Sequence, residues 1–114
     1  MMNPDRCIVE PTMATVPASG GTSIHQIISE SDSRMAFKVK MTNIEEYRVR
    51  PVYGFVEPRG RTKLEILRLE GTAKDDRLAI QYAEVPAEET DVQAPFKAGA
   101  QQGEAIIEIR AVTK

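Results

Sequence analysis

The residues most capable of covalent chemistry are a single cysteine, Cys7, and a single histidine, His25. Together they could form a nucleophilic dyad, in which the imidazole takes the proton of the thiol. That chemistry needs a depressed thiol pKa, which a helix N-terminus or a neighbouring cation supplies. Cys7 falls in a segment that we predict to be an edge strand, with no helix beginning beside it. We therefore expect an inert thiol and a packed or surface histidine.

Other reactive arrangements are incomplete. One cysteine and one histidine fall short of the three or four ligands that a zinc site requires. Gly20 and Gly21 are followed by Thr and Ser, but the lysine and spacing of a phosphate-binding loop are missing. Three pairs of adjacent carboxylates fall in polar connections, where acids are normally solvated: residues 45–46, 75–76 and 88–89. The sequence therefore predicts a protein that is not an enzyme and uses neither a cofactor nor a metal.

The charge of the chain is unevenly distributed, although its formal net value is only −2. Residues 34–63 hold eight basic and three acidic side chains, whereas the remainder holds seven basic and fourteen acidic ones. Either the basic side chains only cover solvated strand faces, or they form a surface that meets an acidic partner. Few aromatic residues lie among them, so nucleic acid is not the expected partner. The candidate binding residues in this segment are Lys38, Lys40, Arg48 and Arg50.

The elements that position these residues are predicted to be β-strands. Seven prolines and seven glycines are scattered along the chain, and no segment sustains a helical period. Strand signals recur at intervals of about 8–12 residues, the spacing of a sandwich or barrel. The expected strands are residues 7–10, 13–16, 22–29, 35–42, 47–50, 52–56, 62–69, 77–83 and 104–112.

Alternation and proline indicate how these strands are arranged. In residues 35–42 the odd-numbered apolar side chains share one face, and Lys38 and Lys40 share the other. Proline cannot donate a ladder hydrogen bond, so Pro11 breaks the first strand at a sheet edge. At Pro51 a strand is expected to bend and pass to the other sheet. The pattern predicts an all-β, immunoglobulin-like Greek-key sandwich, without the tryptophan and cysteine pair of antibody domains.

Three segments carry a resemblance to a known family: Phe37-Lys-Val-Lys-Met-Thr42, Tyr47-Arg-Val-Arg-Pro51 and Gly54-Phe-Val-Glu-Pro58. They resemble the central signature of the major sperm protein (MSP) domain family, in particular the small sperm-specific MSP-domain proteins of nematodes. The resemblance covers almost the whole chain, so residues 1–114 are expected to form a single MSP-like domain. It implies a seven-stranded MSP/PapD-like sandwich with Pro51 as a structural bend, whose peptide bond the sequence leaves open between cis and trans.

The resemblance also implies a function. MSP itself assembles into filaments without bound nucleotide, so we expect a non-enzymatic protein of the sperm cytoplasm, in the pseudopod cytoskeleton that moves the cell. The lone Cys7 fits a reducing compartment. The expected partner is protein: a second copy in a homodimer, MSP, or another cytoskeletal protein of sperm. A basic patch that meets a separate acidic patch builds rings or open filaments. The role would be that of a cytoskeletal component or a regulator of MSP-based assembly.

A sister branch of the MSP domain family suggests an alternative function. The MSP domains of the membrane-tethered VAP group bind acidic peptides with two phenylalanines at a basic groove. By resemblance, Lys40 and Thr42 match the Lys-Thr-Thr of that groove, and Arg77 and Ala79 match its Lys-x-Met pair. The alternative is therefore a module that captures an acidic linear motif at Lys38, Lys40, Thr42 and Arg77. No apolar run approaches the roughly 20 residues of a membrane span, so none is expected.

Residues 84–103 form a long connection rich in Ala, Pro, Glu and Gln. Connections of this length are uncommon in compact domains and are often functional. Phe96 lies within it, and two roles stay open. It is either an exposed anchor for a partner or a plug for the end of the sandwich.

Overall fold

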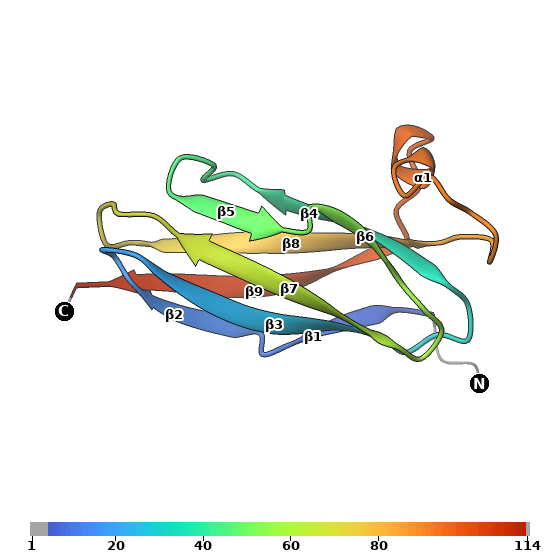
Figure 1. The fold of residues 1–114 in the computed structure, drawn as a ribbon, viewed down its shortest axis with the longest axis horizontal. Helices are drawn as coiled ribbons and strands as arrows, with labels where there is room; N and C mark the ends of the chain where they lie inside the picture. The colour runs from blue at the N-terminus through green and yellow to red at the C-terminus, as the bar shows by residue number, and fades with distance from the viewer. Residues whose placement is uncertain (1–4, 114) are drawn as a thin grey trace.

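The computed structural model describes residues 5–113, which form two facing β-sheets (Figure 1). The four-stranded sheet has the order β1-β3-β7-β5, and the five-stranded sheet has the order β2-β9-β8-β4-β6. Because most neighbours in space are distant in sequence, the chain crosses repeatedly between the sheets in a Greek-key manner. The strands are β1 Cys7–Glu10, β2 Met13–Pro17, β3 Gly21–Ser29, β4 Met35–Met41, β5 Tyr47–Arg50, β6 Tyr53–Val56, β7 Arg61–Arg68, β8 Asp75–Glu84 and β9 Gly103–Val112.

Two strands change sheets at prolines. β5 belongs to the four-stranded sheet and β6 to the five-stranded sheet, and the peptide bond between Arg50 and Pro51 is cis. The first strand is divided in the same way, because β1 and β2 lie in different sheets on either side of a cis bond between Glu10 and Pro11. Within residues 5–113, the nine segments therefore amount to seven strands. The predicted bend at Pro51 and the broken first strand are confirmed, as is the sandwich.

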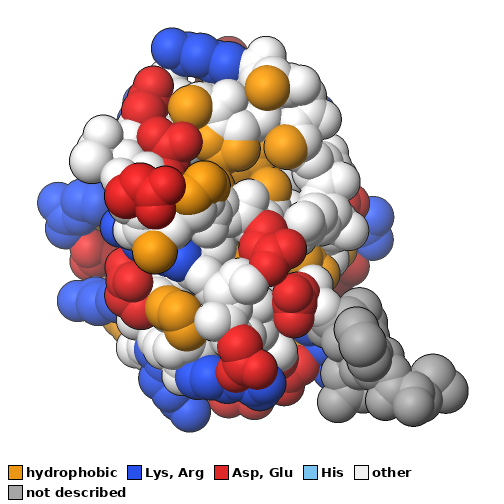
Figure 2. Space-filling view, turned by 90° about the vertical axis from the view of Figure 1, so that its right-hand side faces the viewer, with side chains coloured by type: hydrophobic (Ala, Val, Ile, Leu, Met, Phe, Trp, Pro, Cys, Tyr) orange, Lys and Arg blue, Asp and Glu red, His pale blue; other side chains and the backbone are white. Residues whose placement is uncertain are grey.

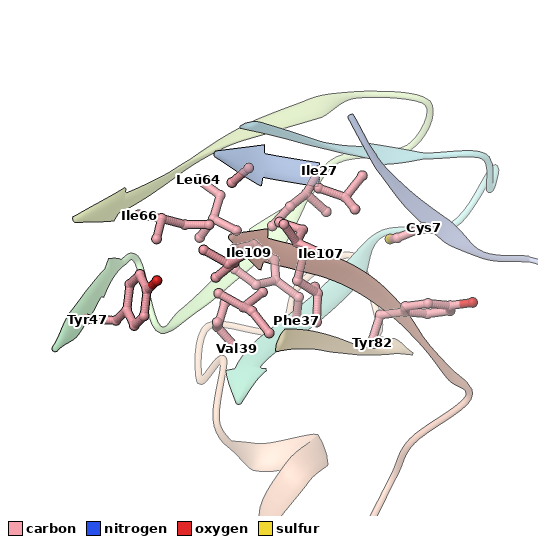
Figure 3. Close-up of a cluster of buried hydrophobic side chains, with 14 of the residues drawn as sticks. Cys7, Ile27, Phe37, Val39, Tyr47, Leu64, Ile66, Tyr82, Ile107 and Ile109 are labelled. Atoms are coloured by element: carbon pink, nitrogen blue, oxygen red, sulfur yellow. The ribbon is translucent and has the colours of Figure 1, made fainter. Parts of the chain in front are cut away.

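The core lies between the sheets and is built from alternate residues of each strand. On β4, Met35, Phe37 and Val39 are buried, which confirms the alternation expected from the sequence. Burying each such side chain contributes about 1.5–3 kcal/mol. Figure 3 shows the inward-facing residues that surround Phe37 from other strands, among them Ile27, Leu64, Ile66, Ile107 and Ile109.

One charged side chain, Arg68, is buried with only 1% of its surface exposed. Its Nη2 donates a hydrogen bond to the Thr72 carbonyl at 2.9 Å, and its Nε lies 3.4 Å from the Ala18 carbonyl. The Glu46 carboxylate is 3.7 Å from Nη1 and balances the charge. These contacts fasten two turns and the segment before β5 to one another. Nothing in the local sequence marks Arg68 as buried.

The long connection predicted over residues 84–103 spans residues 85–102 and contains a short helix, α1 Ala94–Lys97, followed by Gly99 with φ +85°. One expectation about the connections needs correction, because Asp75 and Asp76 do not lie in a turn: β8 begins at Asp75. The register of β8 on β9 sets Asp75 opposite Arg110, with 3.7 Å between carboxylate and guanidinium. In the described residues, no helix is long and apolar enough to cross a membrane.

Candidate protein-binding surface

Lys38 and Lys40 project from the outer face of the five-stranded sheet, because β4 turns its larger apolar residues inward. The register sets Lys38 between Tyr53 of β6 and Gln81 of β8, and it sets Lys40 opposite Ala79. The Lys38 ammonium lies 5.9 Å from the centroid of the Tyr53 ring, within the range of a cation–π contact. Among residues 5–113, no carboxylate forms an ion pair with either lysine. Both charges are thus open to a partner.

Thr42 and Arg77 extend the same surface. β4 ends at Met41, which pairs with Leu78, and extending this register by one residue sets Thr42 opposite Arg77 of β8. Lys40 and Arg77 lie on the same outer face, because Ala79, the partner of Lys40, and Arg77 are two residues apart on β8. That they bind a partner together with Thr42 stays a prediction. Arg77 is engaged by the Glu108 carboxylate at 2.9 Å, an exposed ion pair that a partner's acid would have to displace.

Arg48 and Arg50 lie on β5, in the other sheet. Arg50 pairs with the Glu65 carboxylate at 2.6 Å, and this hydrogen bond lowers the pKa of Glu65. The guanidinium of Arg48 folds back and donates to the carbonyl of Tyr47 at 2.8 Å and to that of Ile44. The six basic and polar candidates therefore do not lie on one sheet. Lys38, Lys40, Thr42 and Arg77 form one group, which we call the lysine face, and the two arginines of β5 lie apart from it.

Phe96 rests on the outside of the five-stranded sheet. Its ring centroid lies 6.0 Å from that of Tyr53, with the planes tilted by 55°. Phe96 is half-buried and does not belong to the core cluster between the sheets. It is therefore not a plug of the sandwich, and it contacts the same tyrosine ring that Lys38 faces.

Arg34 holds the connection that carries α1. Its Nη1 donates to the carbonyls of Ala87 and Glu89 at 3.3 and 2.6 Å, and its Nε donates to the Glu57 carboxylate at 2.9 Å. The guanidinium carbon also lies 3.8 Å from the centroid of the Phe55 ring. One side chain thus joins the beginning of β4, strand β6 and the long connection.

An acidic segment accompanies this helix. Figure 2 shows the end of the molecule that carries α1, where apolar side chains gather and acidic side chains border them. Residues 84–103 hold Glu84, Glu88, Glu89 and Asp91 against a single basic residue, Lys97. The chain therefore presents two lysines without ion-pair partners among residues 5–113 on the outer face of one sheet, and a predominantly acidic connection.

The reactive residues do not form a catalytic dyad. Burial raises the pKa of the Cys7 thiol to about 12, so the thiol is protonated at neutral pH. The buried His25 has Nδ1 2.7 Å from the Pro11 carbonyl and Nε2 2.8 Å from the Ser23 hydroxyl. Both ring nitrogens therefore have partners other than the thiol. In the part of the chain that the structure describes, no three His, Cys, Asp or Glu residues are placed to hold a metal ion.

Two residues that organise this surface were not singled out from the sequence, namely Arg34 and Tyr53. A usable signal existed for Tyr53, because residues 53–56 alternate aromatic with smaller side chains, which predicts one aromatic face. No comparable signal existed for Arg34, whose partners Ala87 and Glu89 lie far along the chain.

Comparisons with known proteins agree with this architecture. A family model described as the MSP (Major sperm protein) domain matches residues 2–105. Sperm-specific class P protein 32 of Caenorhabditis elegans is 69% identical over 99 residues, which cover 87% of this chain and 92% of that protein. The solved structure of WR4, a C. elegans MSP family member, has 63% identity and a TM-score of 0.89, and the match covers 91% of this chain and 95% of that one.

A more distant likeness supports the fold alone. The PapD-like domain 7 of human CEP192 has 10% identity and a TM-score of 0.67, and the match covers 100% of this chain and 92% of that one. The immunoglobulin-like sandwich is thus shared well beyond recognisable sequence similarity. Since the MSP family model spans most of the sequence and a highly identical relative covers it as well, this chain belongs to the MSP domain family.

Proposed function

We propose that this protein is a non-enzymatic, protein-binding component of nematode sperm cytoplasm, acting as a cytoskeletal element or as a regulator of MSP-based assembly. The observation that carries the proposal is the lysine face, on which Lys38 and Lys40 stand without acidic partners among residues 5–113. The relatives, which are sperm-specific class P proteins of a nematode, support the cellular setting.

The chemistry of the lysine face favours an acidic protein surface as its partner. Exposed lysines accelerate encounter and orient the partner, while each contributes modest affinity by itself. The acidic connection of residues 84–103 has the complementary charge. Because the two surfaces are distinct patches of one chain, a contact between them in different molecules is heterologous and can extend an assembly. MSP or another copy of this chain is therefore the expected partner.

The test is binding to purified nematode MSP, measured by sedimentation and by the growth rate of MSP filaments. The double variant Lys38→Glu/Lys40→Glu should weaken binding at least about tenfold, equivalent to about 1.4 kcal/mol. Lys63→Glu is the matched control, because Lys63 is an exposed strand lysine of the other sheet. Binding should also weaken as salt rises, since exposed charges are screened. Absence of any binding to MSP and of any effect on filament growth would overturn the proposal.

A second candidate function is capture of an acidic peptide on the lysine face. The observation that favours it is the register that sets Lys40 opposite Ala79, two residues from Arg77 on the same strand. An acidic peptide with two phenylalanines should bind the protein weakly, and Lys40→Glu should abolish this binding. Ala79→Met adds apolar area beside the lysine and should strengthen it. If neither the original protein nor the Ala79→Met variant binds the peptide, this candidate is removed.

A further inference from the structure

β5 is an edge strand of the four-stranded sheet, where β7 is its hydrogen-bonded neighbour. Figure 1 shows it at the border of that sheet. The side of an edge strand that faces away from its neighbour presents N–H and C=O groups, which can pair with an extended segment of another protein. We call this side of β5 its outer edge. The backbone and side chains of β5 determine which segment fits there.

The backbone of β5 pairs with β7 at every second residue. Glu46, the residue just before β5, accepts a hydrogen bond from Leu69 N–H at 2.8 Å, and the antiparallel register continues from there. Because hydrogen-bonding direction alternates along a strand, Arg48 and Arg50 direct their N–H and C=O groups toward β7. Val49, between them, therefore directs both of its backbone groups to the outer edge.

The solvent-facing side chains of β5 are cationic. Arg48 and Arg50 are exposed, whereas Val49 is half-buried and packs against the core. Together with Glu65 and Leu67 of β7, these residues line a groove of about 230 Å³. Arg50 uses Nη2 to pair with Glu65, and among residues 5–113 Arg48 has no carboxylate in an ion pair. The groove therefore offers guanidinium donors to an incoming acid.

Arg48 protects the outer edge when no partner is bound. Its Nη1 donates to the carbonyl of Tyr47 at 2.8 Å and to that of Ile44. By the same alternation, the Tyr47 carbonyl points to the outer edge, so the guanidinium occupies the place that a partner's N–H would take. A guanidinium binds a carboxylate more strongly than a neutral carbonyl. An acidic segment can therefore displace Arg48 from the edge, whereas a neutral strand offers it no better acceptor.

We propose that the outer edge of β5 binds an extended segment of another protein with the pattern acidic–apolar–acidic. In an antiparallel pair, the apolar residue lies opposite Val49 and exchanges two hydrogen bonds with it. The acidic residues on either side of it lie opposite Arg48 and Arg50, on the same face of the sheet. Backbone pairing supplies the affinity, and the alternating charges supply the specificity.

Charge complementarity is the reason that the occupant is acidic. A second β5 would set arginines against arginines, and like charges directly opposite each other are destabilising. The site is also distinct from the lysine face, because Lys38 and Lys40 lie on β4 in the other sheet. It therefore adds a second binding site to the proposed function and does not depend on it.

The contact is small. A segment of a few residues buries less than the roughly 1,200–2,000 Å² of a stable interface. We therefore expect a dissociation constant between about 10 μM and 1 mM for an isolated peptide.

The test uses the fluorescently labelled synthetic peptide Thr-Glu-Val-Glu-Val-Glu-Thr, whose binding to the full chain is followed by anisotropy. The control peptide, Thr-Glu-Glu-Val-Val-Glu-Thr, has the same composition, but no two of its acids are separated by one residue. It should bind at least about fivefold more weakly, because its acids cannot face both arginines at once. Binding of the first peptide should weaken as salt rises.

Variants of the protein locate the binding site. Arg48→Glu/Arg50→Glu should weaken binding at least about tenfold. This variant should instead bind Thr-Lys-Val-Lys-Val-Lys-Thr, which the original protein should not bind. Lys38→Glu/Lys40→Glu is the matched control, because it makes the same change of charge on the lysine face, and it should bind the acidic peptide like the original protein. Thermal unfolding checks that each variant is folded.

Hydrogen exchange on the unaltered protein tests the backbone pairing. The amide of Val49 should exchange more slowly when the acidic peptide is bound, whereas those of Arg48 and Arg50, which face β7, should not change. Absence of peptide binding, or equal binding of the two acidic peptides, would overturn the proposal. Binding without protection of Val49 would overturn strand pairing. Loss of binding in Lys38→Glu/Lys40→Glu but not in Arg48→Glu/Arg50→Glu would place the peptide on the lysine face, so the two sites fail separately.

Discussion

The ring of Phe37 occupies the space that any side chain at position 54 would need. The two residues are paired across β4 and β6, and a Cβ atom on Gly54 would lie 2.6 Å from Cζ of Phe37. Phe37 opens the first of the three family segments, and Gly54 opens the third. Their presence together is therefore explained by packing, because the phenylalanine fills the core only where the facing strand lacks a side chain.

This relationship predicts the effect of Gly54→Ala. The new methyl group must displace the Phe37 ring, and overpacking of this kind costs about 1–3 kcal/mol. Urea unfolding should show a lower midpoint for the variant. In Gly54→Ala/Phe37→Leu the smaller side chain makes room, so the two effects should not add. Strict additivity in this cycle would show that the methyl group and the ring do not meet.

The burial of the Cys7 thiol predicts low reactivity toward thiol probes and a stability that depends on pH. Burial raises the pKa of Cys7 from 9.0 to about 12, so a thiol probe at neutral pH should label the folded protein only through unfolding. Because the folded state holds the proton more tightly than the unfolded state does, this group contributes stability below pH 9.0. The contribution is lost as pH rises toward 12.

Cys7→Ala is the comparison that isolates this effect, because the tyrosines that also titrate at high pH are present in both proteins. The free energy of unfolding of the original protein should fall more steeply than that of Cys7→Ala between about pH 8 and pH 11. Parallel curves, or rapid labelling of Cys7 under native conditions, would contradict a buried thiol.

The contacts of Arg34 predict that this side chain holds the connection between β8 and β9 in place. Arg34→Ala removes the donors to the Ala87 and Glu89 carbonyls and the ion pair with Glu57. Protease cleavage within residues 85–102 should become faster by about tenfold or more, while global stability falls by only about 1–2 kcal/mol. Arg34→Lys keeps the charge but lacks the planar fork, so it should restore only part of the protection. Unchanged cleavage in Arg34→Ala would show that other contacts hold the connection.

Much of the fold could be predicted because its signals are local. Alternation in residues 35–42 identified β4 and its inward face, and Pro51 marked the place where a strand leaves one sheet for the other. Both signals depend on backbone geometry within a few residues. The predicted limits of β8, residues 77–83, were too narrow. Asp75 belongs to the strand because it pairs with Arg110 on β9, and no local pattern indicates that pairing.

The candidate surface could be predicted only in part. Lys38 and Lys40 were correctly assigned to the outward side of β4, since they alternate with its apolar residues. Arg48 and Arg50 are equally basic and close in sequence, yet they lie in the other sheet, because the chain crosses to that sheet between β4 and β5 and returns only at Pro51. The place of Phe96 on Tyr53 also depended on the path of a long connection that carries no periodic pattern.

The sequence by itself determined the class of the fold, the inward residues of its clearest strands and the membership that its three segments indicate. These follow from the two-residue period of a strand and from the special geometry of proline and glycine. Only the tertiary structure decided that Arg68 is buried and that Lys38 and Lys40 lie in a different sheet from Arg48 and Arg50. Each of these depends on which distant strands become neighbours, and local chemistry does not specify that choice.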